Sequence, residues 1–329
     1  MTQNFIPSYI KLYSSGIFAE RIQLLQNKMQ NCDICPQNCL ADRTASEFGK
    51  CLSGDKAIVS SYTAHFGEEP VISGRNGAGN IFFGNCNLKC IYCQNHEISQ
   101  SKSSKLMKEV SDEELADIMI KLQETGCHNI GLVSPTHFGV QILNSIYIAI
   151  EKGLSIPIVY NSNGYDSVEM LKLFHGVIDI YLPDLKYGSN IYSKELSKCP
   201  DYFEFAKLAL QEMYSQIGHE HVLEDGLLKR GLIVRHLVLP NDLSESESAL
   251  KFIADLNPEI YISLMSQYFP DHKAVLHPLL GRKIRHREYE KVLEFVEKIG
   301  LHNGWIQEPE SADTYRPYFN DSRENPFRN

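Results

Sequence analysis

The sequence predicts an α/β fold in which a parallel sheet is covered by helices and curls into a partial or full (β/α) barrel. Short apolar runs typical of buried strands alternate with longer segments of helical apolar spacing from about residue 80 to residue 300. Alternation of this kind forms a parallel sheet with helical crossovers. The hydrophobic content of 43% over 329 residues is enough for an ordinary core.

Each predicted strand is a short run dominated by apolar residues. The first is Ile81-Phe82-Phe83, which follows a glycine-rich segment. The others are expected at 129–134, 156–160, 177–182, 233–239 and 260–264.

Helices separate these strands, and several begin at residues suited to capping. Ser111 and Glu114 form a capping box ahead of a helix that ends at Gly126. Ser167 and Asp201 are predicted to cap two later helices. Further helices are expected in the second half of residues 1–30, at 140–153, from residue 244 and at 288–299.

The chain is expected to hold one large barrel between two smaller segments. A helical and cysteine-rich extension is predicted at 1–78, the barrel at 79–307 and a tail at 308–329. The tail is rich in proline, asparagine, aspartate and arginine, and poor order is common at such termini.

The composition narrows the class of protein. The formal net charge of -9 argues against broad nucleic-acid binding through a basic surface. No run approaches the roughly 18 to 20 apolar residues of a membrane span. The start, Met1 to Tyr9, lacks the pattern of a signal peptide. We therefore expect a cytoplasmic protein with no membrane partner and no general nucleic-acid binding.

Three cysteines follow the first predicted strand directly. Cys86, Cys90 and Cys93 have the spacing C-x3-C-x2-C, and we call residues 86–93 the three-cysteine loop. An ordinary iron–sulfur cluster has four cysteine ligands. A site with three leaves one metal atom open, as in reactive metal sites. The other interpretations are a zinc knuckle with a distant fourth ligand and three unrelated buried thiols.

Four more cysteines stand earlier in the chain with the pattern C-x2-C-x3-C-x11-C, and we call Cys32, Cys35, Cys39 and Cys51 the N-terminal cysteine set. Four thiolates from two short loops suit a tetrahedral zinc or a closed four-cysteine cluster. The set is therefore an auxiliary iron–sulfur cluster that relays electrons, a structural zinc, or a group that binds nothing. Clustering of seven of the nine cysteines favours metal ligation in a reducing cytoplasm over disulfides.

Catalytic residues of (β/α) barrels lie just past the C-terminal ends of the strands. That rule selects six segments, which are unusually polar or turn-like: 85–94, 134–137, 161–164, 183–186, 240–242 and 265–268. Ahead of the first predicted strand, His65, Glu68 and Glu69 form either a further site or a polar turn.

The three-cysteine loop, with Tyr92 before its last cysteine, resembles the signature of the radical S-adenosylmethionine (SAM) superfamily. The resemblance implies a partial barrel of the radical SAM type and a 4Fe-4S cluster held by Cys86, Cys90 and Cys93. It implies that SAM chelates the fourth iron through its amino and carboxylate groups, with Tyr92 beside the cofactors. One electron from the cluster then splits SAM, and a 5′-deoxyadenosyl radical takes a hydrogen atom from the substrate.

Three further segments, 160–165, 179–186 and 235–240, look like the family of pyruvate formate-lyase activating enzyme. The likeness covers about residues 80 to 270 and is closest to a branch with a cysteine-rich N-terminus. Where that family usually has Gly-Gly-Glu to meet the SAM amino group, this chain has Ser134-Pro135-Thr136-His137. Thr136 or the backbone near Ser134 would then supply the contact.

The same resemblance implies roles for polar residues after the later strands. Asn161, Ser162 and Asp184 would hold a monovalent cation beside the SAM carboxylate, with an asparagine at 161 where the family has an acid. Lys186 would lie near that carboxylate, and Arg235 near the carboxylate and ribose. Lys186 and Asp184 are thus the catalytic candidates. The plain alternatives are surface salt bridges for Lys186 and Arg235.

The predicted activity is that of a radical SAM oxidoreductase, a homologue of the activating enzymes of glycyl-radical enzymes. Its partners would be a glycyl-radical enzyme or other protein substrate and a flavodoxin- or ferredoxin-type reductant. One alternative is a radical SAM enzyme that modifies a small molecule or another macromolecule. The other is an iron–sulfur or zinc protein that binds partners or relays electrons without SAM turnover.

Overall fold

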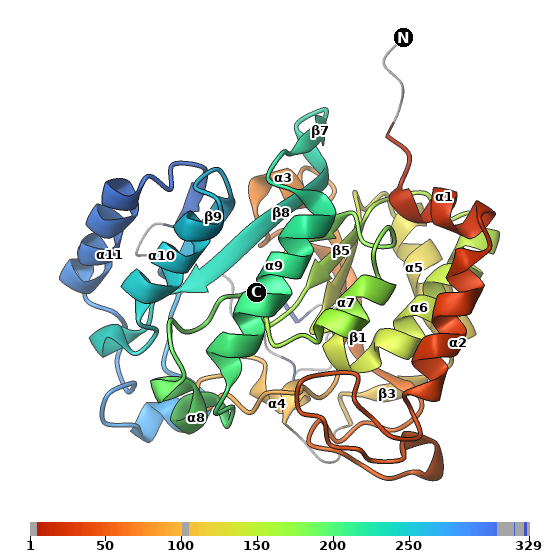
Figure 1. Ribbon diagram of the computed structural model, residues 1–329, viewed down its shortest axis with the longest axis horizontal. Helices are drawn as coiled ribbons and strands as arrows, with labels where there is room; N and C mark the ends of the chain where they lie inside the picture. The colour runs from red at the N-terminus through yellow and green to blue at the C-terminus, as the bar shows by residue number, and fades with distance from the viewer. Residues whose placement is uncertain (1–4, 101–104, 308–318, 320–325, 328–329) are drawn as a thin grey trace.

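The computed structural model describes residues 5–100, 105–307, 319, 326 and 327, so most of the predicted tail lies outside the described residues. The predicted α/β class is confirmed. The described chain forms a sheet of ten strands in the order β10-β9-β8-β6-β5-β4-β2-β1-β3, with β7 paired to β8 off this path. Figure 1 shows the helices arranged around the sheet.

Seven strands form the parallel part of the sheet and correspond to a partial barrel. Each of the six that the sequence predicts is mostly buried, because helices cover the parallel region and leave little room for polar side chains. Five of them have two to six residues, whereas β8 has eleven. The seven strands are β2 (Ala78–Phe83), β4 (Ile130–Val133), β5 (Ile158–Asn161), β6 (Ile180–Tyr181), β8 (Leu227–Leu237), β9 (Tyr261–Met265) and β10 (Gly304–Ile306).

The remaining strands run antiparallel to their neighbours. β1 (Ala57–His65) pairs with β2 on one side and with β3 (Lys108–Val110) on the other, and β7 (Val222–Glu224) forms a hairpin with β8. β1 belongs to the predicted extension 1–78, yet it is hydrogen-bonded to the first barrel strand across that boundary.

Helices cover the sheet between strands: α5 (Asp112–Glu124), α6 (Gly139–Glu151), α7 (Val168–Leu173), α9 (Tyr202–Ile217), α10 (Ser246–Leu256) and α11 (His286–Ile299). α5 begins with the predicted capping box, in which the Ser111 hydroxyl accepts from the Glu114 N–H and the Glu114 carboxylate accepts from the Ser111 N–H. Short helices occupy the connections: α3 (Pro70–Ser73), α4 (His96–Ser99) and α8 (Ile191–Ser197).

The N-terminal helices pack on the barrel. α1 (Ser8–Ser14) and α2 (Ile17–Asn27) contribute Tyr9, Phe18 and Leu25 to the same apolar core as the parallel strands and their helices. The loop that follows α2 passes under the barrel near α4 in Figure 1 and carries the N-terminal cysteine set. No helix among the described residues is both long and apolar enough to cross a membrane.

Candidate functional site

A cavity of about 450 Å³ opens at the edge where the parallel strands end. Five of the six segments selected by the barrel rule contribute to its wall. The segment 240–242 does not, because β8 turns away and Asn241 binds Leu279 and Glu288 at the surface. The predicted site residues that line the cavity are Cys86, Cys90, Tyr92, Cys93, Ser134, Asn161, Ser162, Asp184, Lys186 and Arg235.

Each sulfur of the three-cysteine loop has a hydrogen-bond partner. Leu88 N and Asn163 Nδ2 both lie 3.4 Å from Cys86 Sγ. The Ser197 hydroxyl donates to Cys90 Sγ over 3.0 Å, and Ser99 Oγ lies 3.2 Å from Cys93 Sγ. Donors around a cluster sulfur orient the ligand and set the reduction potential of the metal.

The environment of these thiols is poorly solvated. Burial raises the pKa of Cys90 to about 12 and also raises the pKa of Cys93. A metal must therefore displace the thiol protons when it binds. Among the described residues, no three His, Cys, Asp or Glu side chains converge closely enough to hold a single metal ion.

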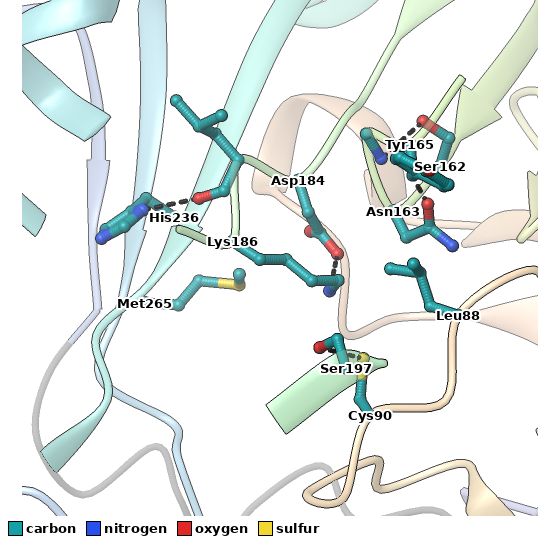
Figure 2. A network of polar contacts seen from close by, with 12 residues as sticks. Leu88, Cys90, Ser162, Asn163, Tyr165, Asp184, Lys186, Ser197, His236 and Met265 are labelled. Carbon is teal, nitrogen blue, oxygen red and sulfur yellow. Dashed lines mark hydrogen bonds and ion pairs between the residues drawn. The ribbon is translucent and has the colours of Figure 1, made fainter. Parts of the chain in front are cut away.

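Lys186 and Asp184 form an ion pair over the cysteines, with 2.5 Å between Nζ and Oδ2. Burial opposes the positive charge, but Asp184 and Cys90 raise the pKa of Lys186 above its usual value, so the side chain is a fixed cation. Figure 2 shows the lysine side chain passing between Asp184 and Met265. The ammonium thus lies on the cavity wall close to the three-cysteine loop.

Arg235 lies on β8 and is held by two acids from the segment between β1 and β2. Its guanidinium bonds Glu69 over 2.6 and 2.9 Å and also pairs with Glu68. Burial works against ionisation of Glu68, but Arg235 lowers the pKa of that carboxyl to about 2. His65, Glu68 and Glu69 all line the cavity.

Thr136 and Ser162 meet at a buried carboxylate beneath the cavity. Asp166 accepts hydrogen bonds from Thr136 Oγ1 at 2.7 Å, Ser162 Oγ at 2.6 Å and Tyr160 OH at 2.9 Å. Thr136 does not line the cavity, whereas Ser134, with φ of 59°, does. The network fixes the two loops that follow β4 and β5. Thr136 is engaged in this network, so Ser134 is the better candidate for a contact with a ligand in the cavity.

A chain of hydroxyl groups leads from the cavity to a cysteine. Tyr92 OH lies 2.9 Å from Tyr187 OH, which lies 2.6 Å from Ser197 Oγ, the donor to Cys90. Tyr92 is buried and also stacks edge-on against Tyr268 across the cavity. Tyr92 therefore forms part of the cavity wall, and its hydrogen bonds help to hold the three-cysteine loop in place.

Two buried histidines bind backbone or serine oxygens. His137 Nε2 lies 3.0 Å from Gly84 O, and His236 lies 2.6 Å from Leu185 O and 2.9 Å from Ser246 Oγ. Burial lowers the pKa of His137 to about 3 and that of His236 to about 4, so both are neutral at pH 7. Neither histidine lines the cavity.

The N-terminal cysteine set lies beside the three-cysteine loop. Its four cysteines are free of disulfides, and three of them are buried. Gln37, between two of these cysteines, donates to the Asn87 carbonyl over 2.8 Å. Asn85 donates to the carbonyl of Leu52 over 2.9 Å.

Several residues of the site had no signal in the sequence. Ser99, Asn163 and Ser197 are ordinary polar residues whose role appears only when the fold brings them to a cysteine sulfur. Ser197 is 107 residues from Cys90. The adjacent acids Glu68 and Glu69 were the one available hint, because two neighbouring carboxylates need a cation once they are buried.

Comparison with known proteins gives the following similarities. The family model of the radical SAM superfamily matches residues 80–208. Uncharacterized protein MJ0674 of Methanocaldococcus jannaschii is 33% identical over 305 residues, which are 91% of this chain and 83% of the relative. Uncharacterized protein MJ0808 of the same organism is 24% identical over 193 residues, which are 54% of this chain and 55% of the relative.

Two solved structures are similar at lower identity. A radical SAM methyltransferase from Sphaerobacter thermophilus has a TM-score of 0.49 and 11% identity, and the match covers 70% of this chain and 66% of that one. HydG, a maturase of the [FeFe]-hydrogenase, has a TM-score of 0.45 and 14% identity over 69% of this chain and 51% of that one.

The residues present fit the cofactors that this superfamily uses. Three thiols, each with a hydrogen-bond partner at its sulfur, face a cavity of about 450 Å³. That volume lies within the range of small-molecule sites. A lysine cation on the same wall complements a carboxylate such as the one SAM carries.

Proposed function

This chain belongs to the radical SAM superfamily, and we propose that it reductively cleaves SAM and abstracts hydrogen as a homologue of glycyl-radical-enzyme activating enzymes. The family implies an enzyme with a 4Fe-4S cluster and SAM. The observation that supports the proposal most is that the three-cysteine loop, Lys186 and Arg235 share one cavity at the ends of the parallel strands.

The cysteines of the three-cysteine loop are the proposed ligands. When bound, the cluster supplies an open iron for SAM and the electron that splits it. Asn163, Ser99 and Ser197 hold the three sulfurs in place. Lys186 offers its ammonium to the SAM carboxylate, and Ser134 with Asn161 lines the part of the wall where the amino group is expected.

Arg235 holds its place in the cavity through Glu68 and Glu69. Both carboxylates bind the guanidinium, so Arg235 is held in position before any ligand arrives. Little side-chain entropy is therefore lost when a ligand binds to it. We propose that its free edge faces the ribose of SAM. Apolar side chains of the cavity wall, Leu88, Met265 and Tyr268, exclude water from the place where a radical forms.

A monovalent cation beside Asp184 stays a prediction. The Lys186 ammonium is already 2.5 Å from that carboxylate and supplies a positive charge there. If Lys186 takes the place of the cation, exchange of sodium for potassium leaves SAM binding unchanged. A dependence of SAM affinity on the cation would instead support a cation site at Asn161, Ser162 and Asp184.

The size of the cavity favours a protein substrate over a second small molecule. SAM is itself a drug-sized ligand, and about 450 Å³ is near the lower end of ligand pockets. Once SAM is bound, the remaining space suits a narrow segment such as a glycine in a loop. A radical SAM enzyme that acts on a small molecule is the second candidate, and the ion pairs of the wall would favour a polar one.

Free cysteines and a cluster of this kind also support a reducing cytoplasm as the place of action. We propose a flavodoxin- or ferredoxin-type protein as the electron donor. The formal charge of -9 gives no support to general nucleic-acid binding.

The experiment uses a peptide of the type Arg-Val-x-Gly-Tyr with α-deuterated glycine. The anaerobically reconstituted protein is incubated with SAM, dithionite and the peptide, and 5′-deoxyadenosine is analysed by mass spectrometry. Deuterium in the product is the expected result, and it should be absent with the unlabelled peptide. If 5′-deoxyadenosine forms without deuterium, SAM is cleaved but the hydrogen does not come from glycine, which would contradict the proposed target. No product from a fully loaded cluster would contradict both.

A further inference from the structure

We propose that the N-terminal cysteine set binds a second iron–sulfur cluster, which passes electrons to the cluster of the three-cysteine loop. The inference rests on the proposed function, because it concerns the route by which the electron for SAM cleavage enters. Four observations carry it: the closeness of the four cysteines, the fit of Cys39 against Gly49, a buried arginine beside them, and the contacts between the two cysteine groups.

The cysteines of the set lie close together: Cys39 Sγ is 3.9 Å from Cys32 O, and Leu40 N donates to Cys32 O over 3.0 Å. Cys32, Cys35 and Cys51 are each less than 10% exposed, and burial together with the other three thiols raises the pKa of Cys35. Backbone N–H groups of Ile34 and Gln37 donate to the sulfurs of Cys32 and Cys35. Such N–H···S bonds are the contacts that tune iron–sulfur sites.

Gly49 makes room for a fourth sulfur. A Cβ at this position would lie 2.3 Å from Cys39 Sγ, well inside van der Waals contact. Any residue other than glycine would therefore displace Cys39 from the group. Glycine at this position thus lets Cys39 lie beside the other cysteines of the set.

Arg43 is a buried cation without an acidic partner among the residues described. It is 1% exposed, and its guanidinium donates to the carbonyls of Gly54 and His137 and also lies within hydrogen-bond reach of the Cys32 thiol. An isolated buried charge is costly. Its positive charge also acts on the Cys32 thiol. Four thiolates on a metal centre would carry the negative charge that this arginine otherwise lacks.

The place of the set favours a cluster over zinc. Zinc has no redox chemistry, so a zinc site gains nothing from lying beside the three-cysteine loop. A closed four-cysteine cluster can accept and pass on an electron, and a position beside the cluster that cleaves SAM suits that role.

Two hydrogen-bonded contacts join the groups. Gln37, two residues from both Cys35 and Cys39, donates to Asn87 O over 2.8 Å, and Asn87 follows Cys86. Asn85, which precedes Cys86, donates to the carbonyl of Leu52, which follows Cys51. Consecutive Cα atoms are about 3.8 Å apart, so each contact lies within one or two residues of a ligand on both sides.

The electron count of the proposed route balances. One electron from a low-potential flavin or iron–sulfur protein reduces the second cluster by one charge. The same electron then reduces the cluster of the three-cysteine loop and passes to the sulfonium of SAM. The S–C5′ bond breaks into methionine, which keeps the electron pair, and the 5′-deoxyadenosyl radical.

The first test counts metal and needs no activity. The wild type, reconstituted anaerobically, is expected to bind about eight iron and eight sulfide per chain. Cys86→Ala/Cys90→Ala/Cys93→Ala should keep about four, with an electron paramagnetic resonance (EPR) signal that SAM does not change. Cys32→Ala/Cys35→Ala should lose the four iron atoms of the second cluster and keep the four at the three-cysteine loop. Circular dichroism checks that this variant folds. Zinc, or no metal, in the first variant would overturn the second cluster.

The second test measures the relay. Reduced flavodoxin or dithionite is mixed with the protein, and reduction of the SAM-sensitive cluster is followed by freeze-quench EPR. The ratio of the flavodoxin rate to the dithionite rate should fall about ten-fold in Cys32→Ala/Cys35→Ala. It should stay at the wild-type value in Cys127→Ala, which changes a lone buried cysteine. An unchanged ratio in the first variant would overturn the relay. A wild type that takes up both clusters but cleaves no SAM would overturn only the proposed function.

Discussion

At the scale of single residues, the hydroxyl of Ser197 is expected to influence the reduction potential of the cluster. It donates to Cys90 Sγ over 3.0 Å, and such a bond stabilises the more negative, reduced cluster. A hydrogen bond is worth about 1 kcal/mol, equivalent to about 40 mV for one electron. We therefore expect Ser197→Ala to lower the reduction potential by that amount in an EPR redox titration. Ser193→Ala, a buried serine of the same helix that bonds only Asn190 O, should leave the potential unchanged.

The Lys186 ammonium is expected to bind the SAM carboxylate. Hydrogen bonds to charged groups are worth about 1.5–3 kcal/mol, so Lys186→Met should raise the dissociation constant of SAM by about ten- to hundred-fold. The loss also leaves Asp184 without its partner, and repulsion between two carboxylates adds to it. Lys186→Met/Asp184→Asn should recover part of the affinity.

The dissociation constant of SAM is measured by isothermal titration calorimetry, and an exposed ion pair supplies the control variant. Lys251 pairs with Asp255 on the surface of α10, where such contacts contribute little. Lys251→Met should bind SAM as the wild type does. Wild-type affinity in Lys186→Met would show that the ammonium does not touch the carboxylate.

Glu68 links stability to pH through Arg235. The pKa of its carboxyl is about 2 in the folded protein, below the ordinary value of 4.5. The ionised group therefore contributes stability that is present above about pH 4.5 and is lost as the pH falls toward 2. Because Arg235 keeps Glu69, Glu68→Gln should cost only about 1–3 kcal/mol at pH 7.

Urea unfolding of the wild type and Glu68→Gln at several pH values tests this linkage. The difference in free energy of unfolding should be constant above pH 5 and shrink between about pH 4.5 and pH 2. A difference that grows on acidification would mean that the carboxyl is not held ionised by Arg235.

At the scale of elements, helix caps distinguish what sequence can and cannot foresee. Ser111 and Ser167 both looked like caps, but only Ser111 makes a side-chain cap hydrogen bond, to the Glu114 N–H over 3.1 Å. Ser111→Ala should destabilise the protein by about 1 kcal/mol in urea unfolding, and Ser167→Ala by a few tenths at most. Equal costs would contradict the assigned cap of α5.

The parallel strands and their helices could be predicted because each carries a local apolar pattern. β1 has a weaker apolar pattern. Only three of its nine residues are buried, and residues 60–64 are all half-buried. Its antiparallel pairing with β2 depends on the partner and has no local signature. β3, β7 and β10 are three residues long, too short for a period to be read.

Segments that follow strands were predictable as site residues for a similar reason. The C-terminal ends of parallel strands meet at one edge, so Asn161, Asp184 and Lys186 are brought together by topology alone. Ser197 and Glu68 reach the site from a helix and from a loop ahead of the barrel. Asp201 shows the same limit, since its carboxylate binds Tyr165 instead of capping α9.

At the scale of the whole molecule, the N-terminal segment is built into the barrel. Its helices share the barrel core, β1 extends the sheet, and Gln37 and Leu52, near its cysteines, bond Asn87 and Asn85 on either side of Cys86. The arrangement gives the cavity a wall from Glu68 and Glu69, which a barrel beginning at residue 79 would lack.

The three-cysteine loop is expected to leave one iron of its cluster open, and SAM is expected to bind there. EPR of the reduced, reconstituted protein with and without SAM tests it most directly. We predict that SAM changes the signal of the wild type and of Cys127→Ala, and that the change is lost in Cys86→Ala/Cys90→Ala/Cys93→Ala. A wild-type signal that stays the same at saturating SAM, with the cluster fully loaded, would contradict the account.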